Sequence, residues 1–226
     1  MSSSATIVYD WNGTLLDDAA VSHECFLLLL KSIGRSAVSF EQFQEYFDYP
    51  LDRLYINAGF ARDEIEKNME AFQRLFHNNY EPIADGLPLR QSALEILRLA
   101  KDNGVRQVIL SNHITEAITR QTARLGIGDL FDQTLAHGGI EDQVQRATKE
   151  GKLVGYIESH KLNPAETIIV GDLTEEVGIA KKLGLVSVAI TGGCASEARL
   201  RAVGPDYLIH SLKELEPILR ERGFVR

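Results

Sequence analysis

Four short apolar segments constrain the fold more than any other feature of the chain. They lie at residues 5–9, 105–110, 167–170 and 186–190, and stretches with helical spacing separate them. The runs VIL and IIV within them are continuous rather than alternating, which is typical of strands buried on both faces of a parallel sheet. Strands that alternate with helices predict an α/β fold: a doubly wound parallel sheet with helices on both faces.

Residues 17–84 interrupt this alternation, because nothing in them is typical of a β-strand. Apolar residues recur there at helical spacing instead: Phe40, Phe43 and Phe47, and then Ile65, Met69, Phe72 and Phe76. The return to the sheet passes Pro82, Gly86 and Pro88, which suit a hinge. We therefore expect residues 1–16 and 85–226 to form the α/β core and residues 17–84 to form an inserted helical cap, with hinges near Leu16–Asp18 and Pro82–Pro88.

The composition of the chain limits the classes of protein to which it can belong. The 226 residues suit one large domain, or a core with a second lobe. Lys plus Arg total 24 against 32 Asp plus Glu, a net charge of −8, and the basic residues are scattered, so we expect no nucleic-acid partner. The run LLLL at 27–30 is too short for a membrane span, and no signal peptide is visible, which predicts a cytoplasmic protein without a membrane partner. Cys25 and Cys194 do not make a disulfide framework and are expected to be buried.

Polar residues follow three of the predicted strands. Asp10 follows IVY, Ser111 follows VIL and Asp172 follows IIVG, while Lys149 lies in the connection ahead of a helix. In an open parallel sheet, ligands bind at the edge where the strands end. Each residue taken singly has an ordinary explanation, since an acid after a strand is often a helix cap and a lysine is usually solvated. Their joint order favours a shared site.

The stretches that carry these residues match a known pattern: "YDWNGTLLDD", "ILSNH", "TKEGKLVGYIE" and "VGDLTEE", followed by "AVGPDYLIHSLKEL". In this order they resemble the haloacid dehalogenase-like (HAD) superfamily of hydrolases, of the type with a helical cap inserted after the first strand. The ending is similar to that of phosphoglycolate-phosphatase-like members. The resemblance implies a Rossmann-like core, a cap and a hydrolase activity.

The resemblance also implies roles for single residues. Asp10 would be the nucleophile, Ser111 and Lys149 would hold the phosphoryl oxygens, and Asp172 would help to bind Mg²⁺ together with Asp10 and the backbone carbonyl of Asn12. The chemistry agrees, because a carboxylate attacks a phosphate dianion only when the repulsion between them is neutralised. Mg²⁺ accepts one or two carboxylates.

Neighbouring positions complete the predicted site. Gly13 and Thr14 suit a tight turn whose N–H groups face an anion, and Asn112 is expected to bind substrate beside Ser111. Lys152 remains an alternative to Lys149 as the phosphate lysine.

Two positions depart from the family. The usual second acid, two residues after the nucleophile, is Asn12, and an amide can neither protonate a leaving oxygen nor activate water, although it can hydrogen-bond the substrate. The acid four residues after Asp172 is Glu176 where Asp is common. We expect Glu176 to reach the metal or its waters, or to orient Lys149, with Glu175 as the weaker candidate.

Other residues have an ordinary and a functional interpretation. Trp11 is expected to pack, although a "DW" opening is also found in phosphonoacetaldehyde hydrolases, which use a cap lysine; this cap offers Lys31 and Lys67. His23 is expected on a helix surface, with a substitute acid as the alternative. The further histidines His113 and His137 lie at the same predicted edge and could touch substrate.

The sequence thus predicts a Mg²⁺-dependent phosphatase of a small phosphorylated metabolite that acts through an aspartyl-phosphate. Two alternatives stay open: a hydrolase of phosphonate C–P or carbon–halogen bonds, and a weakly active phosphometabolite-binding protein.

Overall fold

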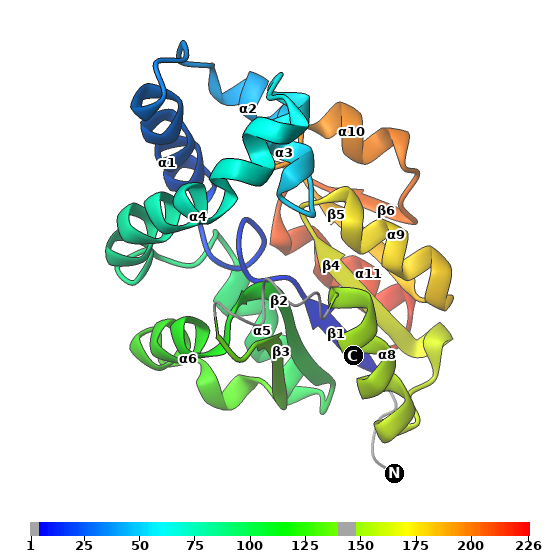
Figure 1. Cartoon of the computed structure of the whole chain (residues 1–226). Coiled ribbons are helices and arrows are strands. Elements are labelled where there is room, and N and C mark those ends of the chain that lie inside the picture. The colour runs from blue at the N-terminus through cyan, green and yellow to red at the C-terminus, as the bar shows by residue number, and fades with distance from the viewer. Residues whose placement is uncertain (1–4, 140–147) are drawn as a thin grey trace.

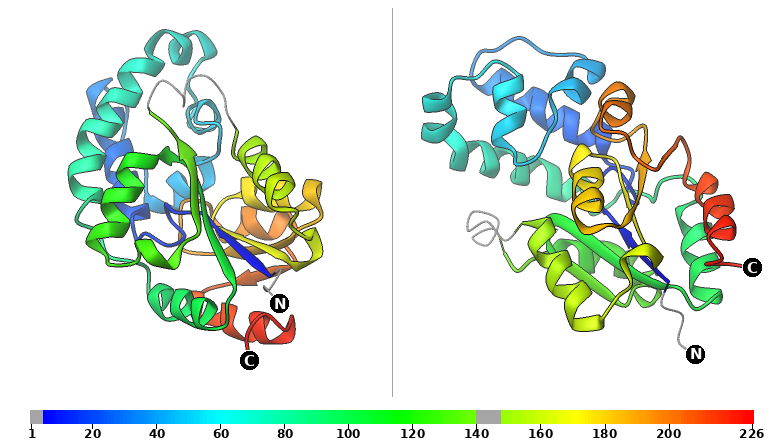
Figure 2. Two further views of the ribbon diagram at one scale, coloured as in Figure 1. Left: turned by 90° about the horizontal axis from the view of Figure 1, so that it is seen from below. Right: turned by 90° about the vertical axis from the view of Figure 1, so that its right-hand side faces the viewer.

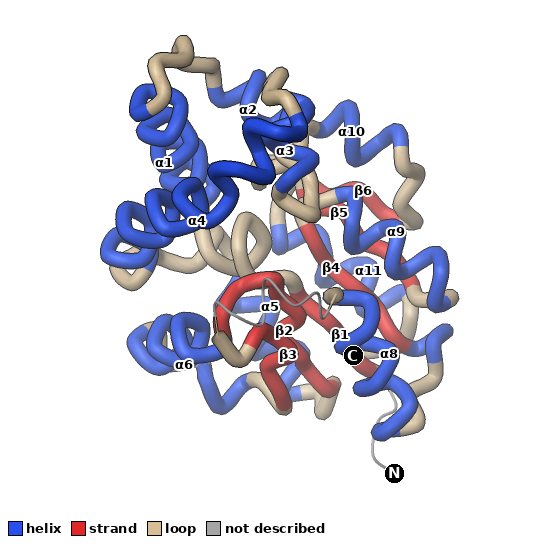
Figure 3. The backbone as a smooth tube through the Cα atoms, in the orientation of Figure 1, coloured by secondary structure: helices blue, strands red, loops and turns tan. Residues whose placement is uncertain are grey.

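The computed structural model describes residues 5–139 and 148–226 and contains one six-stranded parallel sheet (Figures 1 and 3). The spatial order is β3-β2-β1-β4-β5-β6. The strands are β1 (Thr6–Tyr9), β2 (Arg106–Ile114), β3 (Gln133–His137), β4 (Thr167–Gly171), β5 (Val186–Ile190) and β6 (Tyr207–Ile209). The chain moves outward from β1 through β2 to β3 and then crosses to β4 on the other side. This reversal at β1 confirms the predicted doubly wound fold and creates a crevice between β1 and β4.

The two outer strands, β3 and β6, were not predicted from the sequence. They are the edges of the sheet, and apart from His137 and Ile209 their side chains are partly buried or, at Gln133, exposed. An edge strand needs no continuous apolar run, which was the signal used for the central strands. The prediction also ended β2 too early, because the strand continues past Leu110 to Ile114 across an irregularity in its pairing with β3.

Helices cover both faces of the sheet (Figure 2). Alternate residues of β1 supply the two apolar layers: Ile7 and Tyr9 point to one face and Val8 to the other. The first layer contains α5 (Ala93–Asp102), α6 (Thr115–Arg124) and α11 (Leu215–Glu221), and the second contains α8 (Lys149–His160) and α9 (Thr174–Leu183). The other short elements are α10 (Glu197–Ala202) and the 3-10 turns η1 (Gly128–Leu130), η2 (Pro164–Glu166) and η3 (Leu212–Glu214).

Four further helices form the expected helical insert between β1 and α5, and no strand lies within residues 17–84. They are α1 (Ala19–Ser32), α2 (Phe40–Tyr46), α3 (Asp52–Asn57) and α4 (Arg62–Ala84). Figures 1 and 2 show them gathered at one end of the sheet. Their buried aromatic side chains pack on one another, as Phe26, Tyr55 and Phe72 do. The apolar core of the insert is continuous with side chains of the sheet domain, such as Leu173 and Val177.

The two chain crossings between sheet and insert lie side by side. The Asp17 N–H donates to the Pro88 carbonyl at 3.1 Å, and Leu16 pairs with Leu89 in an antiparallel bridge. The exact limits given above for core and cap stay a prediction. Cys25 and Cys194 are both buried and free, as expected. Within residues 5–139 and 148–226, no helix combines the length and the apolar character that crossing a membrane requires.

Candidate active site

The crevice at the reversal point brings Asp10 and Asp172 together. Asp10 directly follows β1 and Asp172 directly follows β4, and these strands are hydrogen-bonded neighbours with Tyr9 opposite Val170. Both carboxylates are almost completely buried. The predicted pair thus lies at the carboxyl edge of the sheet.

Lys149 reaches the same point from another element. It is the first residue of α8, whose start is fixed by the Thr148 side chain accepting from the Gly151 N–H, and it is not in the connection before the helix. Its Nζ lies 2.8 Å from Asp10 Oδ1 and also contacts Glu176 Oε1. Burial lowers the pKa of Lys149, but Asp10 and Glu176 outweigh it and hold the pKa well above its usual value. Lys149 is therefore a buried ammonium paired with Asp10.

Asp172 is fixed by donors that leave its position little freedom. The Thr14 hydroxyl donates to Oδ1 at 3.0 Å, and the Cys194 backbone N–H donates to Oδ2 at 2.7 Å. A Cβ at Gly13 or at Gly193 would overlap the Asp172 carboxylate, and Gly13 also has a φ of +69°. Both glycines are therefore needed for the backbone to approach this carboxylate so closely.

Negative charge exceeds positive charge in this buried cluster. Four buried carboxylates, Asp10, Asp18, Asp172 and Glu176, are accompanied among the described residues by one buried lysine. Burial raises the pKa of Asp10 and of Glu176 to about 7 and that of Asp172 to about 6. A set of buried oxygen ligands short of positive charge fits a divalent cation such as Mg²⁺.

Asn12 belongs to a network that the sequence did not indicate. Its Nδ2 donates to Asp18 Oδ2 at 2.9 Å and to the Tyr80 hydroxyl at 2.7 Å, and its Oδ1 is 3.5 Å from Ser111 Oγ. Asp18 also accepts from the Tyr80 hydroxyl and from the Gly13 N–H. Asn12 is thus a donor between a buried carboxylate and a tyrosine of the insert.

A pocket of about 1020 Å³ lies over these groups. Asp10, Asn12, Lys149 and Asp172 line it from the sheet side. The helices of the insert contribute the opposite wall, including Phe43, Met69, Phe76, His77 and Tyr80. A concave site with an apolar wall and a few convergent polar groups is the usual form of a small-molecule site.

Comparison with known proteins accounts for this arrangement, since residues 7–190 match the family model described as haloacid dehalogenase-like hydrolase. The chain belongs to this family. It is 25% identical to a phosphoglycolate phosphatase of Vibrio parahaemolyticus, over 92% of this chain and 93% of the relative. It is 19% identical to a pyrophosphatase of Halalkalibacterium halodurans, over 95% of this chain and 96% of the relative.

Solved structures share the fold along the whole chain. A haloacid dehalogenase-like protein from Streptococcus pneumoniae superposes with a TM-score of 0.79 at 21% identity, covering 97% of this chain and all of the other. A HAD family hydrolase from Deinococcus radiodurans, solved with bound phosphate and sodium, gives a TM-score of 0.71 at 15% identity. The match covers 98% of this chain and 97% of the other. This protein is accordingly a HAD-like hydrolase with a helical insert.

Several sequence-based expectations need correction in this HAD-like hydrolase. Ser111 and Asn112 lie within β2 and do not follow it, because the strand is longer than predicted. The Gly13 N–H faces the Asp18 carboxylate and the Thr14 hydroxyl donates to Asp172, while their binding of substrate stays a prediction. The Asn112 Nδ2 donates to Glu175 Oε2 at 2.8 Å while lining the pocket.

The positions of the lysines and of Trp11 bear on the alternatives that the sequence left open. Lys152 donates to the Ser111 backbone carbonyl at 3.4 Å, whereas Lys149 pairs with Asp10. Lys31 and Lys67 are exposed and do not line the pocket, which counts against a cap lysine as a catalytic amine. Trp11 packs as expected, fully buried with its Nε1 donating to Gln121 Oε1 at 2.7 Å.

The histidines divide into two groups. His23 does not line the pocket: its Nε2 is 2.9 Å from the Val38 carbonyl oxygen, and its ring packs on Phe40 and Phe43. It is therefore badly placed as a substitute acid. His113 and His137 both line the pocket, and His137 is the last residue of β3.

Asp18, Tyr80 and the Cys194 N–H were missed as parts of the site. Asp18 stands in the quoted "LLDD" stretch, but nothing in the sequence shows that Tyr80 returns to it across 62 positions. A backbone N–H has no sequence signal at all.

Proposed function

We propose that this HAD-like hydrolase is a Mg²⁺-dependent phosphatase that acts on a small phosphorylated metabolite through a phosphorylated Asp10. The observation that carries the proposal is the buried Asp10–Lys149 pair, 2.8 Å apart, at the floor of a pocket walled by the insert. The relatives named as phosphatases support it. In this proposal residues 17–84 are the cap that covers the substrate.

The chain's own groups account for both halves of the reaction. An Asp10 carboxylate oxygen attacks phosphorus, the bond from phosphorus to the leaving oxygen breaks, and that oxygen takes the electron pair. Water then attacks the phosphorus of the aspartyl-phosphate, which releases inorganic phosphate and restores the Asp10 carboxylate. The Lys149 ammonium balances negative charge beside Asp10 throughout, in a site where water is scarce and electrostatic interactions are strong.

Asp10 and Asp172 would hold Mg²⁺, with the Asn12 backbone carbonyl as a further predicted ligand. When bound, the ion supplies positive charge against the phosphoryl oxygens. Glu176 contacts Lys149 and accepts from the Leu173 N–H at 3.2 Å, so we assign it to the positioning of Lys149.

A screen of phosphate esters, acyl phosphates and phosphonates, with and without Mg²⁺, tests this function. We expect Mg²⁺-dependent release of phosphate by the wild type and none by Asp10→Asn, which is nearly isosteric. Asp17→Asn, at an exposed aspartate in the same loop, is the matched control and should keep full activity. Activity that survives in Asp10→Asn would refute the covalent mechanism, and cleavage of phosphonates alone would move the assignment to C–P hydrolysis.

A further inference from the structure

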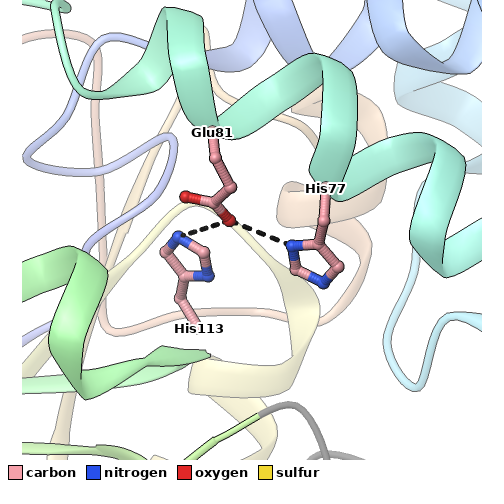
Figure 4. A group of neighbouring side chains, drawn as sticks. All are labelled: His77, Glu81 and His113. Carbon is pink, nitrogen blue, oxygen red and sulfur yellow. Dashed lines mark hydrogen bonds and ion pairs between the residues drawn. The ribbon is translucent and has the colours of Figure 1, made fainter.

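Three potential metal ligands meet where the insert touches the sheet, apart from the carboxylates described above. His77 and Glu81 lie one helical turn apart on α4, and His113 lies on β2 (Figure 4). Glu81 Oε1 is 2.9 Å from His77 Nδ1 and 3.4 Å from His113 Nε2. The three ligand atoms all lie within 4.8 Å of one another.

The environment of this cluster favours a bound cation. The His113 side chain is only 6% exposed, and Glu81 Oε2 is buried without a hydrogen-bond partner among the described residues. Glu81 therefore has a buried carboxylate oxygen still available to a cation.

The donor set selects the kind of ion. Imidazole nitrogen together with a carboxylate oxygen suits Zn²⁺ and related transition metals, whereas Mg²⁺ takes oxygen ligands. Tetrahedral Zn²⁺ with bonds of about 2.0–2.1 Å sets neighbouring ligand atoms about 3.3 Å apart. The separations of Glu81 from His77 and from His113, 2.9 and 3.4 Å, bracket that value, and all three ligand atoms lie within 4.8 Å of one another.

We propose that His77, Glu81 and His113 bind a divalent transition-metal ion of the Zn²⁺ class, which fastens α4 to β2 beside the pocket. Three protein ligands leave one tetrahedral position open. Both histidines line the pocket, so a water molecule has access to that position. The ligands come from the insert and from the sheet, so the ion holds the two together.

Metal binding is tested with the full-length protein in excess Mg²⁺, which fills the carboxylate site first. Addition of Co²⁺ should then give the intense visible absorption of a low-coordinate histidine site, saturating at one ion per chain. Calorimetric titration with Zn²⁺ should give the same stoichiometry. In His77→Ala we expect the band to disappear and the Zn²⁺ affinity to fall by a factor of roughly 10–100 or more, since even the loss of supporting groups around a metal costs this much.

The matched control is His160→Ala, at an exposed histidine that does not line the pocket. This variant should titrate like the wild type. His77→Gln serves as the second variant if His77→Ala loses its circular dichroism spectrum. Hydrogen exchange of the α4 amides should slow on adding Zn²⁺ to the wild type and stay unchanged in the His77 variants.

Two results would overturn the proposal: no Co²⁺ band in the wild type, or the same band in the His77 variants. The cluster would then be a hydrogen-bonded contact only. None of these measurements depends on turnover, so their outcome is separate from that of the phosphatase assay.

Discussion

At the scale of single residues, the Asn12 amide donates hydrogen bonds to two neighbouring oxygens, which a carboxylate could not do. It donates to Asp18 Oδ2 and to the Tyr80 hydroxyl, whose own hydrogen is given to Asp18. An aspartate here would face the buried Asp18 carboxylate at about 3 Å, and two such groups cannot both ionise easily. The amide keeps the loop folded around Asp18 but leaves the site without the second acid.

The dependence of the hydrolysis rate on the leaving group tests the effect of that missing acid. The wild type should hydrolyse aryl and acyl phosphates far faster than alkyl phosphates, because a positioned proton donor contributes about 10²–10⁴-fold. Asn12→Asp should raise alkyl-phosphate turnover by about one decade, below the full effect, because Asp18 opposes ionisation of the new carboxylate. Rates across a series of leaving groups measure both effects.

Asn112→Asp is the control for the Asn12 variant, since it places a carboxylate elsewhere in the pocket wall, beside Glu175. It should give no gain on alkyl phosphates. Equal wild-type rates on alkyl and aryl phosphates would mean that another group already supplies the proton.

At the scale of elements, α4 is the helix that ties the insert to the loop after β1. Its Tyr80 is buried and donates to Asp18, the residue just before α1. Tyr80→Phe should lower the free energy of unfolding by about 2 kcal/mol, because a hydrogen bond to a charged group is lost inside the protein. Denaturant titration measures the change.

Tyr207→Phe provides the comparison, since the Tyr207 hydroxyl makes no hydrogen bond to the described residues and the side chain is partly exposed. Its effect should be close to zero. If the two variants lower the free energy of unfolding equally, the Tyr80–Asp18 hydrogen bond makes no contribution of its own to stability.

The central elements were predictable, and the edges and long-range contacts were not. Burial on both sides makes β1, β2 and β4 apolar runs, and the residues at their ends follow from the rule for parallel sheets. β3 and β6 lack that signal because they are only partly buried. Asp10, Lys149 and Asp172 were found through motif order, whereas the approach of Tyr80 to Asp18 depends on how α4 packs, which a linear pattern does not encode.

At the scale of the whole molecule, the buried carboxylates link stability to pH and metal. Burial raises the pKa values of Asp10, Asp172 and Glu176 to about 6–7, so the folded metal-free protein binds these protons more tightly than the unfolded chain does. The stability they confer is full below about pH 4, the unfolded pKa, and is lost as the pH rises through about 6–7.

Mg²⁺ favours the ionised carboxylates and should therefore raise the melting temperature more at about pH 8 than at about pH 5. Thermal unfolding with and without Mg²⁺ at both pH values measures this difference. Asp172→Asn should reduce the rise at the higher pH. An equal rise at both pH values, or an undiminished rise in Asp172→Asn, would place Mg²⁺ elsewhere.

The central claim is that Asp10 carries the phosphoryl group, and mass spectrometry of the protein quenched in acid during turnover of an acyl phosphate tests it most directly. The account predicts a peptide containing Asp10 heavier by one phosphoryl group in the wild type, and no such peptide in Asp10→Asn. Steady turnover without a phosphorylated peptide, or the same modification in Asp10→Asn, would contradict it.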